Sequence, residues 1–308
     1  MPDAGKTTRS LRRRKGLMVT CGIVLALAVS FCGWVYKAKT QRELNRQLLE
    51  AVRNGDTKEA RSLLKRGAEP NIRNVPEEPL SLWQQIQHVF RKDSQPSDDQ
   101  NASLLEMAMH SDSEDTSQSV NVALIKTLLE AGAHPDDNSE GHVTPLMIAV
   151  QYDSPQTVQM LLNHGANPLA KDDSGKCPIH FLDSDDSDGF KIVEMLLEHG
   201  SDINAVDNHG ETALLLHCTY GKIHMLRFLI AHGAKADVRD KDDNTPLILC
   251  FLTLLLSSSR RTDMVKLLIA HGADVNQRNI LGGTPLSLAK RKKDQQGIRL
   301  LEAAGAKH

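Results

Sequence analysis

The chain has 308 residues with 37 basic and 39 acidic side chains, and aromatic residues make up only 4% of it. Residues 1–40 hold 8 of the basic and 1 of the acidic residues, so the rest carries 29 against 38, a net charge of −9. This balance excludes the basic footprint of a nucleic-acid-binding domain.

The first element in the chain is an uncharged run over residues 17–36. A helix rises about 1.5 Å per residue, so this run would span about 30 Å, the thickness of a bilayer's hydrocarbon core. We therefore predict a transmembrane helix over residues 17–36, between a basic tail (1–16) and a juxtamembrane linker (37–40). Trp34 and Tyr36 at its end are typical of a membrane interface. The six basic residues before the run predict a cytoplasmic N-terminus, with the following domain in the periplasm, or in a lumen or outside the cell in a eukaryote.

Two other interpretations of this segment stay open. A cleaved signal peptide also begins with a basic region and an apolar core, and residues 26–28 resemble a cleavage site, although the apolar run continues to Tyr36. A lipid anchor at Cys32 would need a small residue before the cysteine, where Phe31 stands. All three interpretations place the rest of the chain on the same side of the membrane.

One short phrase then recurs seven times, an apolar helix end followed by a glycine and a small residue. From the second copy onward the glycines stand at positions 132, 165, 200, 233, 272 and 305. Glycine takes the left-handed conformation that ends a helix, and recurrence at a nearly fixed period of this length is the signature of a stacked repeat. The copies are LLKRGAEPN (63–71), LLEAGAHPD (128–136), LLNHGANPL (161–169), LLEHGSDIN (196–204), LIAHGAKAD (229–237), LIAHGADVN (268–276) and LLEAAGAKH (300–308).

A second phrase opens five of the units. Thr caps a helix, Pro occupies its first turn, and Leu begins the buried side. The openings are VTPLMIAV (143–150), KCPIHFL (176–182), ETALLLHC (211–218), NTPLILC (244–250) and GTPLSLA (283–289). Together the two phrases resemble the ankyrin repeat over about residues 41–308. The resemblance implies an all-α solenoid of about seven helix-turn-helix units with hairpin tips, which binds proteins and is not an enzyme.

The units at the two ends and one long interval depart from the pattern. The first unit (42–74) keeps the apolar spacing with a charged outer face, and the last has a polar stretch at 291–296, so we expect both to cap the solenoid. The first interval, from Gly67 to Gly132, is nearly twice as long as most of the others. We interpret it as an insertion at 75–100 followed by a degenerate second repeat over 101–136.

Two apolar segments do not fit the simple repeat. Within the insertion, a set of apolar side chains approximates one face of a short helix, which would dock on the solenoid, or on a partner or the membrane surface. These are Leu80, Leu82, Trp83, Ile86, Val89 and Phe90. In the sixth repeat, residues 247–256 (LILCFLTLLL) are followed by SSSRR, a predicted loop that explains the long interval between Gly233 and Gly272. The run is too short to span a bilayer, and we expect an extended buried helix rather than an exposed patch.

The cysteines and histidines could suggest an enzyme, but their positions in the repeat explain them without catalysis. Cys177 and His180 resemble a nucleophile and its base, but they occupy the Thr and His columns of the ankyrin TPLH opening. Cys218 and Cys250 fall at buried helix positions, so we predict three small core residues and no disulfide framework. A histidine stands before the marker glycine in four repeats, where the helix dipole favours a positive charge at the end of the helix. These four histidines lie in different layers of the stack, so we predict that they form no metal cluster. These histidines are His164, His199, His232 and His271.

The acidic stretch DSDDSDG (183–189) superficially resembles a calcium loop. Met195 occupies the position where such a loop needs a bidentate glutamate, so the calcium interpretation fails. We predict a solvated loop between the two helices of the fourth repeat, with an acidic partner-facing surface as the alternative. We expect no cofactor, metal, small-molecule substrate or nucleic acid.

The resemblance implies that a protein partner binds the hairpin tips and the exposed side of the first helices, which form one concave surface. Tyr152 and Tyr220 are candidate anchors because tyrosine is common at the centre of interfaces. The predicted tip residues are Glu140, His142, Lys176, Asn208, His209, Glu211, Lys241, Asp242 and Asn244. The predicted helix residues are Gln151, Tyr152, Thr219 and Tyr220.

We therefore expect a membrane-anchored bacterial protein whose periplasmic solenoid binds a protein partner. Bacterial proteins similar to this one often neutralise a secreted toxin or effector such as a lipase, or protect a periplasmic enzyme. The alternative is a scaffold that tethers an envelope complex. An enzyme fused to ankyrin repeats would need a catalytic domain, and no stretch of the sequence is left to form one.

Overall fold

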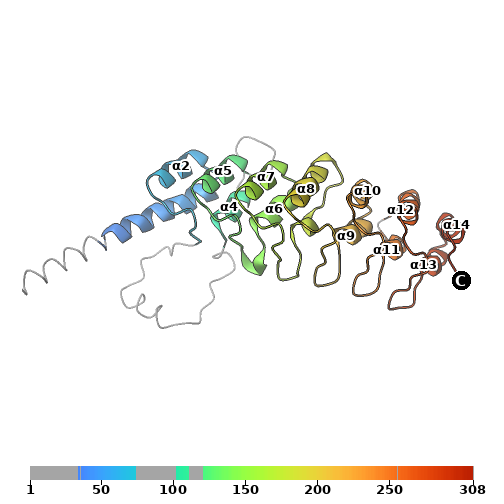
Figure 1. Ribbon diagram of the computed structural model, residues 1–308. Coiled ribbons are helices and arrows are strands. Elements are labelled where there is room, and N and C mark those ends of the chain that lie inside the picture. Colours follow the sequence, from blue (N-terminus) through green and yellow to red (C-terminus); the bar gives the residue numbers. More distant parts are fainter. Residues whose placement is uncertain (1–33, 35, 74–101, 111–120, 255, 308) are drawn as a thin grey trace, which may run out of the picture.

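The computed structural model describes residues 34, 36–73, 102–110, 121–254 and 256–307, and these residues contain helices but no strand. They form seven helix pairs stacked along one axis (Figure 1), which confirms the predicted ankyrin-like solenoid. The pairs are residues 36–53 with α2 (Thr57–Lys65), α4 (Leu104–His110) with α5 (Val122–Glu130), α6 (Pro145–Gln151) with α7 (Pro155–Asn163), η3 (Pro178–Phe181) with α8 (Ser187–Glu198), α9 (Ala213–Tyr220) with α10 (Ile223–Ala231), α11 (Pro246–Leu252) with α12 (Ser258–Ala270), and α13 (Pro285–Arg291) with α14 (Gln295–Ala303).

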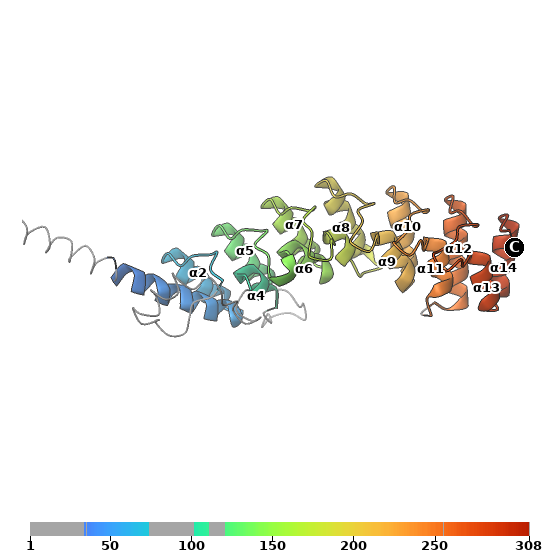
Figure 2. The ribbon, with the colours of Figure 1, turned by 90° about the horizontal axis from the view of Figure 1, so that it is seen from below.

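The first helices of the pairs form one layer and the second helices form another. From α4 onward, each first helix packs on the first helix of the next repeat, as α9 does on α11, and second helices pack likewise. The loops that join consecutive repeats, here called fingers, project from the first-helix layer on the side away from the second helices (Figure 1). Figure 2 shows the same stack from below, running from the helix at 36–53 to α14. This arrangement leaves the fingers and one side of each first helix open.

Threonine begins most first helices as the sequence predicts. The hydroxyl of Thr284 accepts the N–H of Ser287 at 3.1 Å, and proline follows in the first turn. The same cap occurs at Thr144, Thr212 and Thr245. A capped first turn satisfies an N–H group that the helix itself cannot bond, which fixes where each first helix starts.

Glycine ends the second helices because of its backbone conformation. At these glycines φ lies between 84° and 98°, and an added Cβ would meet no atom within 4 Å, so conformation and not space requires glycine. The histidine before the glycine places its ring Nδ1 2.8–2.9 Å from the carbonyl four residues earlier, as predicted for the helix end, at His164, His199, His232 and His271. The glycines are Gly67, Gly132, Gly165, Gly200, Gly233, Gly272 and Gly305.

The core is one continuous apolar layer between the two rows of helices. Cys177, Cys218 and Cys250 are buried in it as free thiols, which confirms them as small core residues. In the fourth repeat the first helix is shorter than the repeat pattern predicts, since only the 3-10 turn η3 forms before Leu182 continues in extended conformation. The degenerate second repeat is confirmed by α4 and α5.

The sixth repeat contradicts the sequence interpretation. Helix α11 ends at Leu252, so the extended buried helix expected over 247–256 is wrong. Leu254 is 88% exposed, whereas Leu256 turns inward and packs over Gly221, where a Cβ would approach the Leu256 side chain to 2.2 Å. The SSSRR segment is not a loop, because most of it forms the first turn of α12, which has 13 residues against 9 in α10. The extra residues of this repeat therefore lengthen both its second helix and the turn that precedes it.

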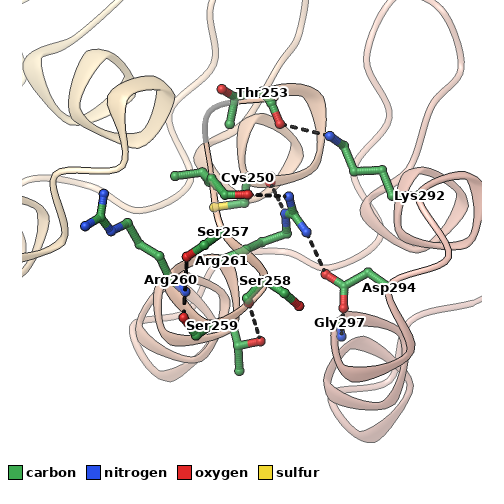
Figure 3. A network of polar contacts seen from close by, with 12 residues as sticks. Cys250, Thr253, Ser257, Ser258, Ser259, Arg260, Arg261, Lys292, Asp294 and Gly297 are labelled. Atoms are coloured by element: carbon green, nitrogen blue, oxygen red, sulfur yellow. Dashed lines mark hydrogen bonds and ion pairs between the residues drawn. The ribbon is translucent and has the colours of Figure 1, made fainter.

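Polar contacts hold this longer helix against its neighbours (Figure 3). Arg261 donates to the carbonyl of Cys250 at 2.9 Å and to that of Leu256 at 3.0 Å. Lys292, just after α13, donates from Nζ to the carbonyl of Thr253 at 2.9 Å. The turn between α11 and α12 is thus bound at both ends, and one of its partners lies in the last repeat.

The predicted membrane span at 17–36 lies outside the described residues except for Trp34 and Tyr36, which are 67% and 75% exposed. Within the described ranges, no helix combines the length and the apolar character needed to cross a bilayer. The insertion predicted at 75–100 also lies outside the described residues.

Candidate protein-binding face

From residue 137 onward, each finger is closed by a side chain that bonds the backbone of its own turn. Asp207 Oδ1 accepts the N–H groups of His209 at 2.7 Å and of Glu211 at 2.9 Å. Asp240 Oδ1 does the same for Asp242 at 2.9 Å and Asn244 at 2.8 Å. Aspartate and asparagine favour such turns because their short side chains reach the backbone two residues on. The finger conformation is therefore encoded locally.

Backbone hydrogen bonds also join each of these fingers, from residue 137 onward, to the next. In each bond the N–H group near one tip donates to a carbonyl at the tip before it, over 2.8–3.0 Å. The bonds run from Asp173 to Gly141, from Asn208 to Ser174, from Lys241 to His209 and from Ile280 to Asp242. The tips consequently form a row of fixed spacing, and a partner that binds them need not first order them.

Most predicted tip residues lie at the surface. His142, Asn208, His209, Lys241 and Asp242 are exposed, as the sequence predicts. His142 Nδ1 lies 2.6 Å from Asp173 Oδ1 on the next finger, and Asn208 Nδ2, one finger further on, donates to the Asp173 carbonyl at 3.0 Å, so these contacts join three consecutive tips.

Three predicted tip residues are less accessible, and one is not described. Lys176 and Glu211 are half-buried, and burial raises the pKa of the Glu211 carboxyl above its usual value. Asn244 is only 9% exposed, because its amide donates to Asp240 Oδ2 at 2.9 Å and accepts from Asn279 Nδ2 at 3.0 Å. Its side chain links two fingers and is not open to a partner. The side chain of Glu140 lies outside the described part of the chain.

On the first helices, the two predicted tyrosine anchors differ in their exposure and in their contacts. Tyr152 is 38% exposed, and its hydroxyl lies 3.1 Å from Nδ1 of His110 on the preceding repeat, with the two rings edge to face. Tyr220 is 55% exposed. Gln151 is exposed beside Tyr152, whereas Thr219 is half-buried and donates to the carbonyl of Leu215 at 3.1 Å. Tyr220 is thus the better placed of the two aromatic anchors.

Sequence reasoning missed three exposed apolar side chains at the C-terminal end of this face. Leu254 is 88% exposed, Ile280 is 61% exposed and Leu281 is 87% exposed. Ile280 and Leu281 occupy the tip where the preceding fingers carry Asn208 and Lys241 and their polar neighbours. The signal in the sequence is the apolar pair of ILGG (280–283), which stands where the preceding tips are polar.

A pocket of about 300 Å³ lies beside these residues, between the last finger and the first helices of the last two repeats. Its apolar lining comes from Leu252 at the end of α11 and from Leu281 and Leu288, and its one charged lining residue is Arg291. The remaining lining residues are Asn279, Gly282, Gly283 and Ser287.

The candidate nucleophile is a buried structural pair. Cys177 Sγ lies 3.2 Å from His180 Nδ1, but that nitrogen also faces the Cys177 N–H at 3.1 Å, and Nε2 lies 3.0 Å from the Ala205 carbonyl. Burial raises the pKa of the Cys177 thiol, which disfavours the thiolate that a nucleophile requires. The pair joins the fourth repeat to the following finger.

Side chains of the acidic stretch at 183–189 also make hydrogen bonds within the stack. Asp186 caps α8 by accepting the N–H groups of Asp188 and Gly189, and Asp185 Oδ1 accepts the N–H of Met225 at 2.5 Å. Among the described residues, no three His, Cys, Asp or Glu side chains form a group that could hold a metal ion.

Comparison with known proteins agrees with this architecture. The family of ankyrin repeats, described as three copies, matches residues 115–207 and 182–279, which is more than half of the chain. The chain belongs to the ankyrin repeat family. Ankyrin repeats are protein–protein interaction modules that use extended concave surfaces, so this chain contains such a module.

Two solved structures and one curated protein are similar to it. An ankyrin repeat domain from Acinetobacter baumannii AYE is 30% identical, with a TM-score of 0.54, over 61% of this chain and 94% of that chain. The ankyrin repeat domain of Bcl-3, a member of the IκB protein family, shares the fold at 22% identity and a TM-score of 0.60, over 83% of this chain and 97% of that chain. Human SH3 and multiple ankyrin repeat domains protein 2 is 27% identical over 131 residues, which is 42% of this chain but only 7% of that protein.

Proposed function

We propose that this solenoid is the partner-binding part of a membrane-anchored protein that acts outside the cytoplasm, where it sequesters a toxin or effector as an immunity or inhibitor protein. The observation that carries the proposal is the row of hydrogen-bonded fingers, which presents side chains in a preset geometry. Preset geometry lowers the entropy cost of association and favours the tight, lasting binding that an inhibitor needs.

The composition of the face supports a protein as the ligand. Its tips combine the cation of Lys241, the carboxylate of Asp242 and polar groups such as Asn208, and Tyr220 offers an exposed aromatic anchor at the end of the first helix α9. Mixed polar tips around aromatic and apolar side chains are typical of protein interfaces. The pocket at the C-terminal end is small and open to the fingers, which suits one side chain of a partner.

The basic tail and the uncharged run at 17–36 support the membrane anchor and the orientation. The three cysteines of the described part are buried, which would protect them in an oxidising compartment. A reporter that is active only outside the cytoplasm, fused after His308, should therefore be active. An active reporter of the cytoplasm-only kind at that position would contradict the orientation.

The inhibitory role is tested genetically in the source cells. Deleting the gene should reduce viability, and a second deletion that removes the bound effector should restore it. A control strain that carries the chain with Lys241→Glu and Tyr220→Ala should behave like the deletion if the face does the binding. A harmless deletion in cells that produce the bound protein would refute the inhibitory role and favour a scaffold.

A further inference from the structure

The C-terminal repeat differs in charge from the rest of the domain. Residues 277–308 carry 7 basic and 2 acidic side chains, whereas residues 41–276 carry 22 basic and 36 acidic ones. One of the two acids, Asp294, is buried in an ion pair with Arg261. The acidic excess lies between the ends, since residues 75–276 carry 14 basic and 31 acidic side chains, and the stack ends in a basic repeat.

Positive charge gathers beside the pocket of that repeat. Arg291 lines the pocket at the end of α13, and Lys292 follows it. Burial lowers the pKa of Lys292 below its usual value, and the positive charges of Arg261 and Arg291 lower it further. Within the described residues Arg291 itself makes no ion pair, so its charge is available to a partner.

Apolar side chains surround the same charge. Leu252, Leu281 and Leu288 line the pocket. Leu254, which is 88% exposed, lies in the turn that the hydrogen bond from Lys292 to Thr253 ties to the end of α13, and Figure 3 shows this bond. Large apolar side chains that gather at a protein surface usually mark an interaction site.

We propose that the notch formed by Leu252, Leu281, Leu288 and Arg291 receives one large apolar side chain of the partner, with a neighbouring Asp or Glu of the partner paired to Arg291. This inference rests on the proposed protein-binding function and names the chemistry of its partner. The occupant is a protein segment that carries a leucine, phenylalanine or tryptophan next to carboxylates.

Shape and charge favour a protein over a membrane at this notch. A bilayer surface would reach the protruding Leu254 and Leu281, but it would not fill a pocket that is lined on its inner side by Leu252 and Leu288. An inserted side chain fills it, and the exposed Arg291 at its edge adds charge selectivity by pairing with a carboxylate of the partner.

The test uses a phage-displayed library of random peptides, selected on the full chain held in nanodiscs of neutral phosphatidylcholine. Enriched peptides should pair a large apolar residue with adjacent acids. Their affinity should fall by about tenfold or more with Arg291→Glu, since a repulsive charge replaces an attractive one, and also with Leu281→Ser. Both side chains lie at the surface, so the variants should fold, which circular dichroism checks.

Matched controls separate the notch from general effects. Arg299→Glu makes the same charge change in α14, and Val206→Ser removes an exposed apolar side chain elsewhere, and neither should reduce peptide binding. Peptides that bind all variants equally, or that lack acids, would overturn the proposal. If binding depends on Tyr220 or Lys241 but not on the notch, the notch proposal fails while the proposed function stands.

Two further outcomes would also overturn it. Self-association of the chain that Leu281→Ser abolishes would assign the notch to a second copy. Protection of residues 278–293 from hydrogen exchange on adding phosphatidylglycerol to the nanodiscs, without any peptide, would assign it to the membrane surface.

Discussion

Arg261 and Asp294 form a buried ion pair that joins the sixth repeat to the seventh. Nη1 of the arginine lies 3.1 Å from Oδ2 of the aspartate, and the two side chains are only 10% and 4% exposed. Asp294 also caps α14 by accepting the N–H of Gly297 at 3.0 Å. One carboxylate therefore serves both the start of the last helix and the long second helix of the preceding repeat (Figure 3).

Removing this carboxylate should destabilise the end of the solenoid strongly. We expect Asp294→Ala to lower the free energy of unfolding by about 3–5 kcal/mol, because the Arg261 charge is left buried without its partner. Neighbour interfaces hold a repeat stack together, so the last repeat should open first. Urea denaturation measures the loss, and hydrogen exchange of α13 and α14 locates it.

An exposed ion pair provides the control. Asp188 and Lys191 lie 2.8 Å apart with side chains 50% and 61% exposed, and Asp188→Ala should cost about 0–1 kcal/mol. Equal losses for Asp294→Ala and Asp188→Ala would show that burial of the first pair does not have the assigned effect.

Lys293 occupies a position that favours glycine. Its φ is 57°, and Gly221 has a φ of 71° at the same point of the fifth repeat. Lys293→Gly should raise the free energy of unfolding by about 1 kcal/mol, since glycine adopts left-handed backbone without a steric cost. Arg299→Gly within α14 should lower it by about 1 kcal/mol. Thermal unfolding of both variants checks the signs, and a loss for Lys293→Gly would contradict the assignment.

The buried thiols should resist modification while the fold is intact. Burial raises the pKa of Cys250 to about 12 and that of Cys218 well above the usual value. Neutral thiols stabilise the fold fully below their unfolded-state pKa of 9.0, and the contribution is lost as the pH rises toward 12. With Cys21 and Cys32 replaced by serine, a disulfide reagent at about pH 8 should label no thiol until urea is added. Rapid native labelling would contradict the burial.

His217 should make stability depend on acid pH. Burial lowers its pKa from 6.5 to about 4, and the nearby charge of Lys222 adds to the effect, while Asp183 opposes it. The neutral imidazole stabilises the fold above pH 6.5, and up to about 3 kcal/mol is lost as the pH falls through 4. His217→Gln should remove most of this loss of stability between pH 6.5 and pH 4. His209→Gln, at an exposed tip, should leave the pH profile of unfolding unchanged. Identical profiles for both variants would contradict the role of His217.

Helix ends could be predicted from the sequence because their signals are local. Thr284 caps its own helix, and Gly272 adopts the left-handed conformation wherever the neighbouring repeats lie. The run at 247–256 could not be interpreted this way, since apolarity alone does not show where a helix stops. Arg261 holds the turn that follows α11 through the carbonyls of Cys250 and Leu256, and it pairs with Asp294 of the next repeat, contacts that the run itself does not reveal.

The same distinction applies to the binding face. Repeat register alone places Lys241 and Asp242 on a tip, whereas the burial of Asn244 follows from its contact with Asn279 on the next finger. The pocket was not predictable, because its lining comes from separate segments, among them Leu252 and Arg291, that only the stacked structure brings together.

The proposed binding surface for the partner consists of the fingers and the first helices. Its most direct test is photo-crosslinking in the source cells with benzoylphenylalanine placed at four exposed positions. Lys241 and Tyr220 lie on the claimed face, and Arg227 of α10 and Lys266 of α12 lie on the second-helix layer. The account predicts that one and the same protein is crosslinked from Lys241 and Tyr220 and not from Arg227 or Lys266. Crosslinks to the partner from Arg227 or Lys266 alone would contradict it.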